Sequence, residues 1–493
     1  MQVLTYSFNE RKEEPLYEYL YKEIKRDIEQ GIIAPGEKLP SKRAFSRHLG
    51  VSLITVEGAY TQLIAEGYVI SKERKGYYAN SVLPEPTLTT QRHRQNSFEP
   101  SLKNKFQGAL FQESKSEKRE EKPSFFADLT GSEVARGRFP YGSWSKSIRD
   151  ALSCESEQVL IGNSDTAGSR RLREVLANYL YSFRGMEVDP ECIVIGAGSQ
   201  ILDNMIIQLL GQMHTYGIEN PGYPRLQQLY RANRVNLVCL PLDDKGVVTE
   251  ALYGSDVSVM HVMPSHQFPT GLITPISRRY ELLAWASEGD RYLIEDDFDS
   301  EFRLTGRPIP SLQSIDKQGC VIYTNTFSKT LGPAFRLGYM VLPHALKERF
   351  DKTLSFYSCT VSAVDQLALA RFIEQGDYER HVNRMRNYYR ALRNKLISEL
   401  MKSSFSSRIS LYSQDSGIHF VMHVETKEQE QRLALELQKR GVNIVSLSEF
   451  YLDATMAKNK ETSSGRARFL MSYSGLSEEA IPKVISVMEE VFK

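Results

Sequence analysis

Hydrophobic positions recur with helical spacing in the N-terminal part of the chain. From Leu16 to Ile28 an apolar residue returns every four positions, which predicts an amphipathic helix over residues 16–30. Two shorter helices are expected next, because Ser41 and Ser52 each precede an apolar pattern and can cap a first helical turn. This part of the chain is therefore expected to form three helices.

Two short apolar runs follow the third predicted helix. Gly67–Ser71 and Tyr77–Ala79 have strand-like composition, and the turn sequence KERKG joins them. Three helices followed by a hairpin are typical of a winged helix-turn-helix, whose third helix would enter a DNA major groove. The alternative is a three-helix interaction module with a solvated face.

The pattern changes after this module. Residues 81–124 are polar, carry charges of both signs and end in SEKREEK, which predicts a flexible linker. From there on, apolar runs such as CIVIGAG and RYLIEDD alternate with helical stretches, which predicts an α/β domain around a mostly parallel sheet. The predicted divisions are residues 12–80, 81–124 and 125–493.

Composition and charge narrow the function classes. The 493 residues are 41% hydrophobic and 25% charged, which excludes a mostly disordered or collagen-like chain. The net charge of +1 by itself argues against a nucleic-acid-binding protein. Residues 38–80, however, hold seven lysines and arginines against three acids, a local charge of +4 that the large near-neutral remainder dilutes. The local charge therefore favours DNA binding.

Cysteine usage and hydropathy point to the cytoplasm. The five cysteines are widely spaced and show no metal-ligand spacing, so we expect reduced thiols and no metal site. The N-terminal sequence has no signal-peptide pattern, and no run reaches about 18 apolar residues, so no membrane span is expected.

A glycine-rich turn joins a strand-like run to a helical run in IVIGAGSQ. Gly196 and Gly198 would let a ligand approach the backbone, and a helix that begins at Ser199 would present free N–H groups to an anion. This physics favours a phosphate cradle, although many strand-to-helix turns carry glycines for packing alone.

Acidic residues end another predicted strand. Tyr292–Ile294 is expected to be buried, and Glu295–Asp297 would then lie at the edge where open α/β sheets bind ligands. A carboxylate there can hold a protonated ring nitrogen, or the segment can be a solvated acidic turn.

A lysine and an arginine follow a third predicted strand. Lys329 could form a Schiff base if its surroundings lower its pKa, and Arg336 could clamp a phosphate. Tyr223 in ENPGYPR could stack on an aromatic cofactor. Together with the glycine turn and the acidic segment, these residues predict a site for pyridoxal phosphate.

The N-terminal module resembles the GntR-type winged helix. The resemblance runs through LPSKRAFSRHLGVSLITVEGAYTQLIAEGYVISKERKGYYA. Position 53 is often arginine in that family and is Leu53 here, which implies an altered operator contact. The resemblance and the local charge together imply DNA contacts from Ser41, Lys42, Arg43, Leu53, Thr55, Arg74, Lys75 and Gly76.

Residues from about 125 to 493 resemble fold-type I aminotransferases, most specifically in FSKTLGPAFRLGY. Joined to a GntR-type winged helix, they resemble the MocR/GabR class of bacterial transcription regulators. This implies a large sheet domain with a smaller C-terminal α+β subdomain, Lys329 as the Schiff-base lysine, and Asp296 on the pyridine nitrogen. Tyr223 would lie over the ring or the incoming amine. The implied phosphate ligands are Gly198, Ser199, Gln200, Ser328 and Arg336.

The sequence departs from active aminotransferases around the cofactor. Phe268 stands where an asparagine usually precedes Pro-Thr-Gly, and Phe298 stands where a tyrosine usually follows the cofactor aspartate. Both residues would normally reach the same phenolic oxygen. Their replacement weakens the expected catalytic set by about 1 kcal/mol for each hydrogen bond.

The expected carboxylate-binding residues also differ. The C-terminal arginine that binds a substrate carboxylate falls at Leu470, with Arg468 on the same strand face as a partial substitute. Glu449 stands where the GABA-responsive member has an arginine, and Arg225 is a further candidate carboxylate clamp. An amine other than GABA is therefore the expected effector.

Three functions compete at this point. The first is a regulator that senses a small amine, an amino acid or pyridoxal phosphate itself through an imine at Lys329. The second is an active aminotransferase with an appended DNA-binding domain, and the third is a DNA-binding protein with a dimerisation scaffold. The resemblance also implies a homodimer, for which a head-to-tail arrangement is open because a 44-residue linker spans about 35 Å.

Overall fold

The computed structural model places most of the chain. It describes Tyr6 and residues 15–72, 75–80, 125–131, 133–162, 165–304, 309–415, 417–452 and 465–493. The predicted linker 81–124 and Arg74 lie outside the described residues.

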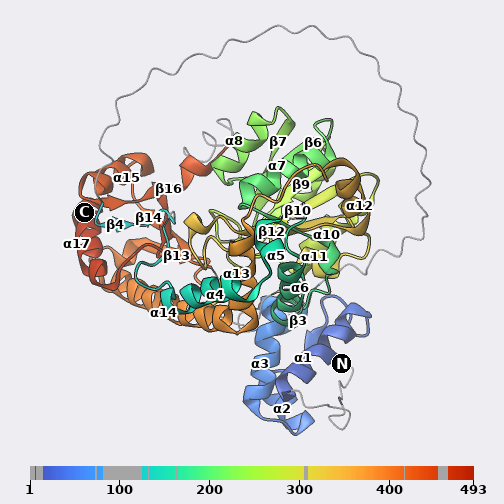
Figure 1. The fold of residues 1–493 in the computed structure, drawn as a ribbon. Coiled ribbons are helices and arrows are strands. Elements are labelled where there is room, and N and C mark those ends of the chain that lie inside the picture. Colours follow the sequence, from blue (N-terminus) through green and yellow to red (C-terminus); the bar gives the residue numbers. More distant parts are fainter. Residues whose placement is uncertain are drawn as a thin grey trace.

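The N-terminal module is a winged helix (Figure 1). Ser41 and Ser52 cap the second and third helices as predicted, since their Oγ atoms accept from the N–H groups of Ala44 and Thr55 at 3.2 and 3.1 Å. The three short strands pair antiparallel in the order β1-β3-β2. The elements are α1 (Leu16–Glu29), β1 (Lys38–Leu39), α2 (Lys42–Leu49), α3 (Leu53–Ala65), β2 (Val69–Lys72) and β3 (Gly76–Ala79).

An eight-stranded sheet forms the centre of the large domain. Its order is β5-β12-β11-β10-β9-β6-β7-β8, and the four pairings from β11 to β7 are parallel. The predicted mostly parallel sheet is confirmed, with β12 inserted antiparallel between β5 and β11. The strands are β5 (Ile193–Gly196), β6 (Thr215–Asn220), β7 (Asn236–Asp243), β8 (Gly246–Val247), β9 (Val259–Val262), β10 (Tyr292–Asp296), β11 (Val321–Thr326) and β12 (Gly338–Val341).

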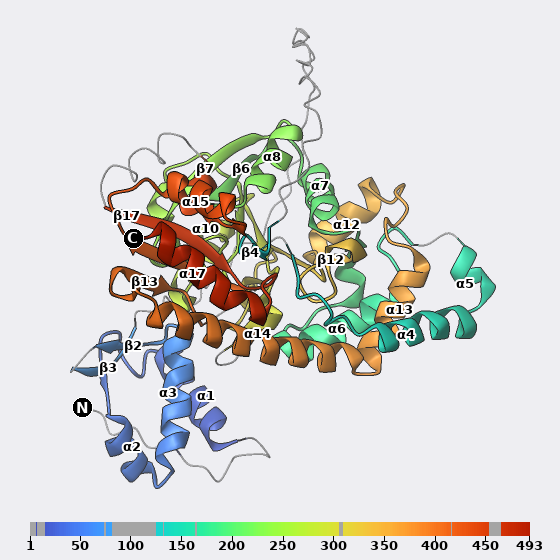
Figure 2. The ribbon, with the colours of Figure 1, turned by 90° about the vertical axis from the view of Figure 1, so that its left-hand side faces the viewer.

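Helices alternate with these strands along the chain and pack around the sheet (Figures 1 and 2). They are α4 (Tyr141–Cys154), α5 (Glu157–Ile161), α6 (Arg170–Arg184), α7 (Ser199–Leu210), α8 (Pro224–Ala232), α9 (Thr249–Tyr253), α10 (Ile276–Ser287), α11 (Leu312–Ile315), α12 (His344–Thr353) and α13 (Ala363–Glu374). Among the described residues, no helix is both long and apolar enough to cross a membrane.

A smaller C-terminal subdomain has its own hydrophobic core and an antiparallel sheet in the order β13-β14-β17-β16. The long helix α14 connects it to the large domain and runs from beneath α17 to α13 (Figure 2). The expected α+β subdomain is therefore confirmed. Its elements are α14 (Asp377–Lys402), β13 (Ile409–Tyr412), β14 (His419–Glu425), α15 (Glu430–Lys439), β16 (Val445–Ser446), β17 (Arg466–Ser472) and α17 (Ile481–Val491), with β15 (Val442–Asn443) paired to β4 (Ala127–Asp128).

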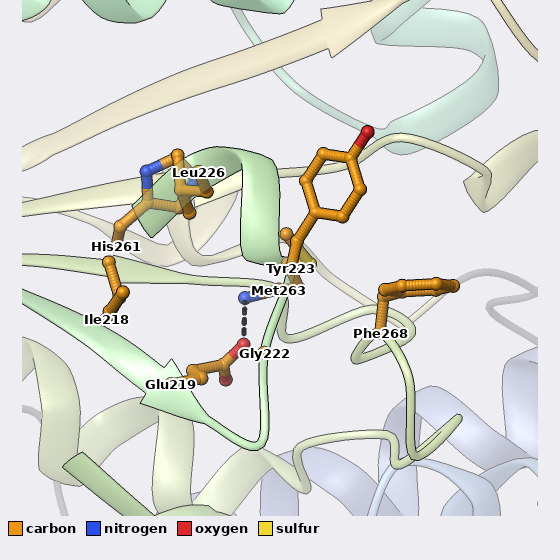
Figure 3. A pocket seen from close by; sticks show the side chains of 8 residues that line it. All are labelled: Ile218, Glu219, Gly222, Tyr223, Leu226, His261, Met263 and Phe268. Carbon is orange, nitrogen blue, oxygen red and sulfur yellow. Dashed lines mark hydrogen bonds between the residues drawn. The ribbon is translucent and has the colours of Figure 1, made fainter. Parts of the chain in front are cut away.

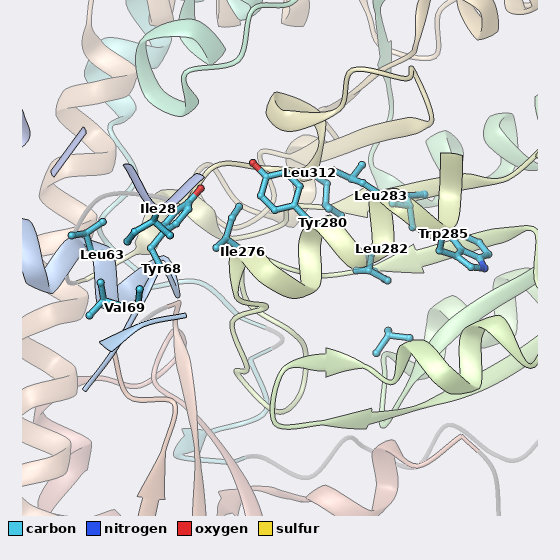
Figure 4. Close-up of a cluster of buried hydrophobic side chains, with 14 of the residues drawn as sticks. Ile28, Leu63, Tyr68, Val69, Ile276, Tyr280, Leu282, Leu283, Trp285 and Leu312 are labelled. Atoms are coloured by element: carbon cyan, nitrogen blue, oxygen red, sulfur yellow. The ribbon is translucent and has the colours of Figure 1, made fainter. Parts of the chain in front are cut away.

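The winged helix docks on α10 of the large domain. Tyr68 and Ile276 belong to one continuous cluster of buried side chains (Figure 4). The N–H of Ile276 donates to the carbonyl of Glu66 at 3.1 Å. A Cβ at Gly67, where φ is +82°, would lie only 3.0 Å from the Pro275 Cβ. The DNA-reading module and the sheet domain are thus packed together through the start of one helix.

Candidate functional site

The predicted cofactor residues gather at one edge of the large sheet. Strand β5 runs in the same direction as β11, because β12 pairs antiparallel with both. The carboxyl ends of β5, β6, β9, β10 and β11 therefore share an edge, which is where open α/β sheets bind ligands. Asp296 lies opposite Thr324 at this edge, and Lys329 lies three residues after β11 ends at Thr326.

Lys329 is half-buried and held by the backbone. Its Nζ donates to the carbonyl oxygen of Gly131 at 2.8 Å. Burial lowers the pKa of Lys329 below its ordinary value, and the opposing effect of the Asp299 charge does not restore it. A lysine with a lowered pKa is more often neutral and hence nucleophilic.

The glycine turn and Arg336 face each other. Gly198 has φ of +87°, and a Cβ built on it would lie 2.8 Å from an Arg336 guanidinium nitrogen. That guanidinium donates to the carbonyl of Ala197 at 2.9 Å, and α7 begins directly after Gly198 at Ser199. A helix N-terminus beside an arginine favours a phosphate group. Ser328 and Ser199 are half-buried, and Gln200 is exposed.

A buried histidine, His261, lies close to Asp296 and was not predicted from the sequence. His261 Nε2 lies 3.8 Å from Asp296 Oδ2, and His261 Nδ1 lies 2.9 Å from the Tyr230 hydroxyl. Burial opposes protonation of His261, but the nearby carboxylate of Asp296 and the charge of Asp203 raise its pKa overall. The available signal was a histidine within the otherwise apolar strand β9.

Aromatic rings line the outer part of this edge. Phe268 makes edge-to-face contacts with Tyr223, Phe298 and Phe450, at centroid distances of 5.7, 6.4 and 5.2 Å. Tyr223 and Phe268 also line a small pocket with Glu219 (Figure 3). Phe268 and Phe298 bring no hydrogen-bonding group.

The predicted effector residues differ in their burial and in their partners. Leu470 and Arg468 share a strand face as expected, and Leu470 is buried in the cluster that Phe268 packs against. Arg468, however, is engaged by Glu430 at 3.5 Å and by the Tyr451 hydroxyl at 3.4 Å. Two further candidates are exposed: Arg225, in the first turn of α8, and Glu449, which accepts from Ser446 Oγ at 3.1 Å.

The predicted DNA contacts lie at the N-termini of α2 and α3 and at the wing. Arg43, Leu53 and Lys75 are exposed, and the Thr55 hydroxyl lies 2.8 Å from that of Ser52, the exposed cap. The wing glycine, Gly76, is half-buried, with φ of +107°.

Two features of this surface were not foreseen. Lys42 Nζ is paired with Glu57 at 2.7 Å, so that Lys42 must exchange this partner to reach a phosphate. Ile54 is 80% exposed beside Leu53, and apolar side chains there suit thymine methyl groups.

Comparisons with known proteins agree with this geometry. Residues 16–78 match the family of bacterial regulatory proteins of the gntR family, and residues 135–487 match aminotransferase class I and II. The chain is 35% identical to the uncharacterized HTH-type transcriptional regulator YdeL of Bacillus subtilis over 97% of both chains. The chain belongs to this family of regulators.

Two further relatives carry functional names. The chain is 29% identical to the probable rhizopine catabolism regulatory protein MocR of Rhizobium meliloti, over 97% of this chain and 94% of that protein. It is 30% identical to the pyridoxine biosynthesis regulator PdxR of Corynebacterium glutamicum, over 88% of each chain. An archaeal alanine:glyoxylate aminotransferase has the same fold, with a TM-score of 0.65 and 23% identity over 74% of this chain and 90% of that chain.

The residues present fit the cofactor of this family, pyridoxal phosphate. A Cβ at Gly198 would clash with the Arg336 guanidinium at 2.8 Å, so the glycine lets this cation lie against the start of α7, where a phosphate is favoured. The Asp296 carboxylate has the chemistry to accept from a ring N–H, and the Lys329 amine has the chemistry to add to an aldehyde. The protein is thus a pyridoxal phosphate-dependent, DNA-binding regulator.

Proposed function

We propose that this regulator senses a small amine at Lys329 and changes its DNA binding in response. The observation that carries the proposal is Lys329 itself, a half-buried lysine with a lowered pKa in a domain on which the DNA-reading module is docked. When bound, pyridoxal phosphate supplies an aldehyde to which primary amines add. Lys329 would hold that aldehyde until an effector amine replaces it.

The surrounding residues would orient the cofactor. Asp296, supported by His261, would accept a hydrogen bond from the protonated ring nitrogen. Tyr223 would cover the ring or the effector, and Phe268 would exclude water from that side. The phosphate would be held by Gly198, Ser199, Gln200, Ser328 and Arg336.

The alternative, an active aminotransferase, has weaker support. Transamination of an amino acid requires its carboxylate to be positioned. Leu470 offers no charge there, and Arg468 is already engaged by Glu430. These contacts favour sensing over turnover. The similarity to a protein named as a pyridoxine biosynthesis regulator supports pyridoxal phosphate itself as a second candidate signal.

A short covalent path connects the site to the docked winged helix. The segment after β9 carries Phe268 at the site and reaches α10 at Ile276, where Glu66 is bonded. Arg279 fixes this segment, because its fully buried guanidinium donates to the carbonyls of Pro264 and Thr274 at 2.7 and 3.0 Å. An effector that favours one arrangement of this segment would therefore bias the winged helix.

We further propose a homodimer in the cytoplasm that reads repeated half-sites in its operator. Head-to-tail packing, with each winged helix on the partner's α10, would use the same docking contact between subunits. Analytical ultracentrifugation of the full chain tests the dimer.

The function is tested by titrating the cofactor-loaded protein with a panel of amines and with additional pyridoxal phosphate. Absorbance reports cofactor exchange, and fluorescence anisotropy of DNA from the region upstream of the gene reports binding. At least one amine should change both signals in parallel. Steady keto-acid production from an amino acid would instead favour the aminotransferase, and no change in DNA affinity with any ligand would contradict the proposal.

A further inference from the structure

Two histidines and an aspartate form a buried cluster next to Lys329. His266 follows β9, Asp299 follows β10, and His419 begins β14 of the smaller subdomain. Each is only 2% exposed. The His266 and His419 ring centroids are 4.3 Å apart, and His266 Nδ1 lies 2.8 Å from Asp299 Oδ2. Lys329 is close enough to interact electrostatically with both Asp299 and His419.

Two ring nitrogens in this cluster require a donor. In a neutral imidazole one ring nitrogen donates and the other accepts, so a His266 ring that donates from Nδ1 to the Asp299 carboxylate at 2.8 Å offers Nε2 as an acceptor. His419 interacts with the Pro269 backbone, which likewise leaves its Nε2 for another partner. Neither Nε2 has a hydrogen-bond partner among the described residues. Buried polar atoms are nearly always paired, so two bare lone pairs indicate a ligand that brings N–H or O–H groups or a cation.

The backbone leaves space for the His266 ring on two sides. A Cβ at Gly271 would lie 3.3 Å from His266 Nε2. A Cβ at Gly417 would collide with the His266 ring and come within 2.7 Å of Asp299 Oδ2. Both glycines have a positive φ, at +68°. The cluster is therefore accommodated by two separate loops.

We propose that His266, backed by Asp299, accepts the proton of the incoming effector amine, with His419 as a second acceptor for its N–H groups. This rests on the proposed function, in which the effector is an amine. An alkylamine arrives at neutral pH as an ammonium ion without a lone pair. In the proposed step an ammonium N–H bond breaks, the electron pair stays on the amine nitrogen, and the proton bonds to His266 Nε2. The Asp299 carboxylate offsets the imidazolium charge.

The charged groups around the two histidines favour His266, and not His419, as the acceptor of the amine proton. Burial, His266 and Lys329 together hold the pKa of His419 well below its ordinary value, so His419 stays neutral. Asp299, which bonds His266, also interacts with Glu301 and Tyr473. The rings of Phe268 and Phe298 complete the surroundings at 5.4 Å from His419 and 6.3 Å from His266, and they add no charge.

Two amine probes test whether His266 acts as a proton acceptor or only supports the structure of the site. Butylamine is protonated at neutral pH and needs a base, whereas methoxyamine is neutral and needs none. In the cofactor-loaded full chain, His266→Asn should slow the absorbance change with butylamine on the order of 100-fold and leave that with methoxyamine within about two-fold. The variant's rate with butylamine should then rise about ten-fold per pH unit, following the free amine.

His423→Asn is the matched control. His423 lies on β14 as His419 does, but it is half-buried against Tyr412, with ring centroids 4.3 Å apart. Both probes should react with this variant at the wild-type rate. Equal slowing of both probes in His266→Asn would show a structural role and overturn the inference. If neither probe reacts with the wild type, the proposed function fails, and this inference fails with it.

A measurement on the cofactor-free protein tests whether the two histidines and Asp299 accept protons or instead bind a metal ion. The three side chains could also hold a cation, because their donor atoms lie within 4.8 Å of one another. Nitrogen-15 spectra of the histidine-labelled, cofactor-free chain should show both Nε2 atoms unprotonated at neutral pH. Incubation with Zn²⁺ followed by elemental analysis should leave no stoichiometric metal. Stoichiometric zinc that is lost in Asp299→Asn would overturn the inference.

Discussion

The DNA-contact residues predicted for the winged helix lie on the surface, whereas the groups around Lys329 lie inside the protein. Arg43 and Leu53 are exposed at helix N-termini. Gly198, Asp296 and Lys329, by contrast, sit at the end of a sheet whose strands are almost entirely buried. Exposed charges are screened by salt and tolerate small changes of shape, while a packed interior responds to a single methyl group. DNA binding should therefore be sensitive to salt, and sensing should be sensitive to volume.

The largest effect is expected from removing the lysine. Lys329→Ala should abolish both the visible absorbance change and the amine-induced change in DNA affinity, because no amine remains to hold the cofactor. Effector-free DNA affinity should stay within about three-fold, since the winged helix is untouched. Absorbance and anisotropy titrations measure both. A large loss of effector-free affinity would show that the two regions are not separable.

A methyl group at the glycine turn should have the next largest effect. In Gly198→Ala the new Cβ would lie 2.8 Å from the Arg336 guanidinium, so cofactor affinity should fall at least about ten-fold. Gly211→Ala is the control, because Gly211 also has a positive φ (+105°) but no atom within 4 Å of the added Cβ. Both variants carry a backbone strain of about 1–3 kcal/mol, because both glycines combine a positive φ with an extended ψ. Equal cofactor affinities would mean that crowding at Arg336 is irrelevant.

On the exposed side, Arg43→Gln should weaken DNA binding about ten-fold and lower the slope of log affinity against log salt by about 1. Lys439→Gln removes a cation from the C-terminal subdomain, where Lys439 pairs with Glu436, and should leave the slope unchanged. Anisotropy at several salt concentrations gives both numbers. An unchanged slope in Arg43→Gln would place Arg43 away from the phosphates.

The smallest effect is expected at the contact between the two regions. Gly67→Ala would crowd the Pro275 Cβ, which lies 3.0 Å from the new atom, and should reduce the effector-induced change in DNA affinity by about 1 kcal/mol. Gly36→Ala has a similar φ of +79° within the same module but open space around it. The ratio of DNA affinities with and without effector checks this. Identical ratios in the two variants would show that the docking contact at Gly67 does not transmit the effect of the effector.

The two regions also differ in how far the sequence predicts them. Ser41 and Ser52 cap helices through contacts only three residues away, so local pattern suffices for the winged helix. Asp296 and Lys329 were predictable because strand ends of an α/β sheet converge at one edge. The boundaries of the linker at 81–124 and the roles of the single site residues stay predictions.

Contacts between distant segments were not predictable in this way. His266 and His419 meet only because two subdomains close on each other, and no local spacing records it. The pairing of Arg468 with Glu430 likewise joins β17 to α15. The same holds for the docking of Gly67 on Pro275, which depends on the packed arrangement of two modules.

The shared core between the winged helix and α10 has a consequence for how such a protein unfolds and can be recombined. Because Tyr68 and Ile276 are buried in one cluster, the small module gains stability from the large one, and the two should melt in a coupled transition. A reading head taken from another regulator would expose the α10 surface unless it brought a matching face at positions 66–69. The end of the winged helix in the sequence is therefore not a boundary between independently unfolding units. A functional chimera would have to bring a matching face or exchange α10 together with the winged helix.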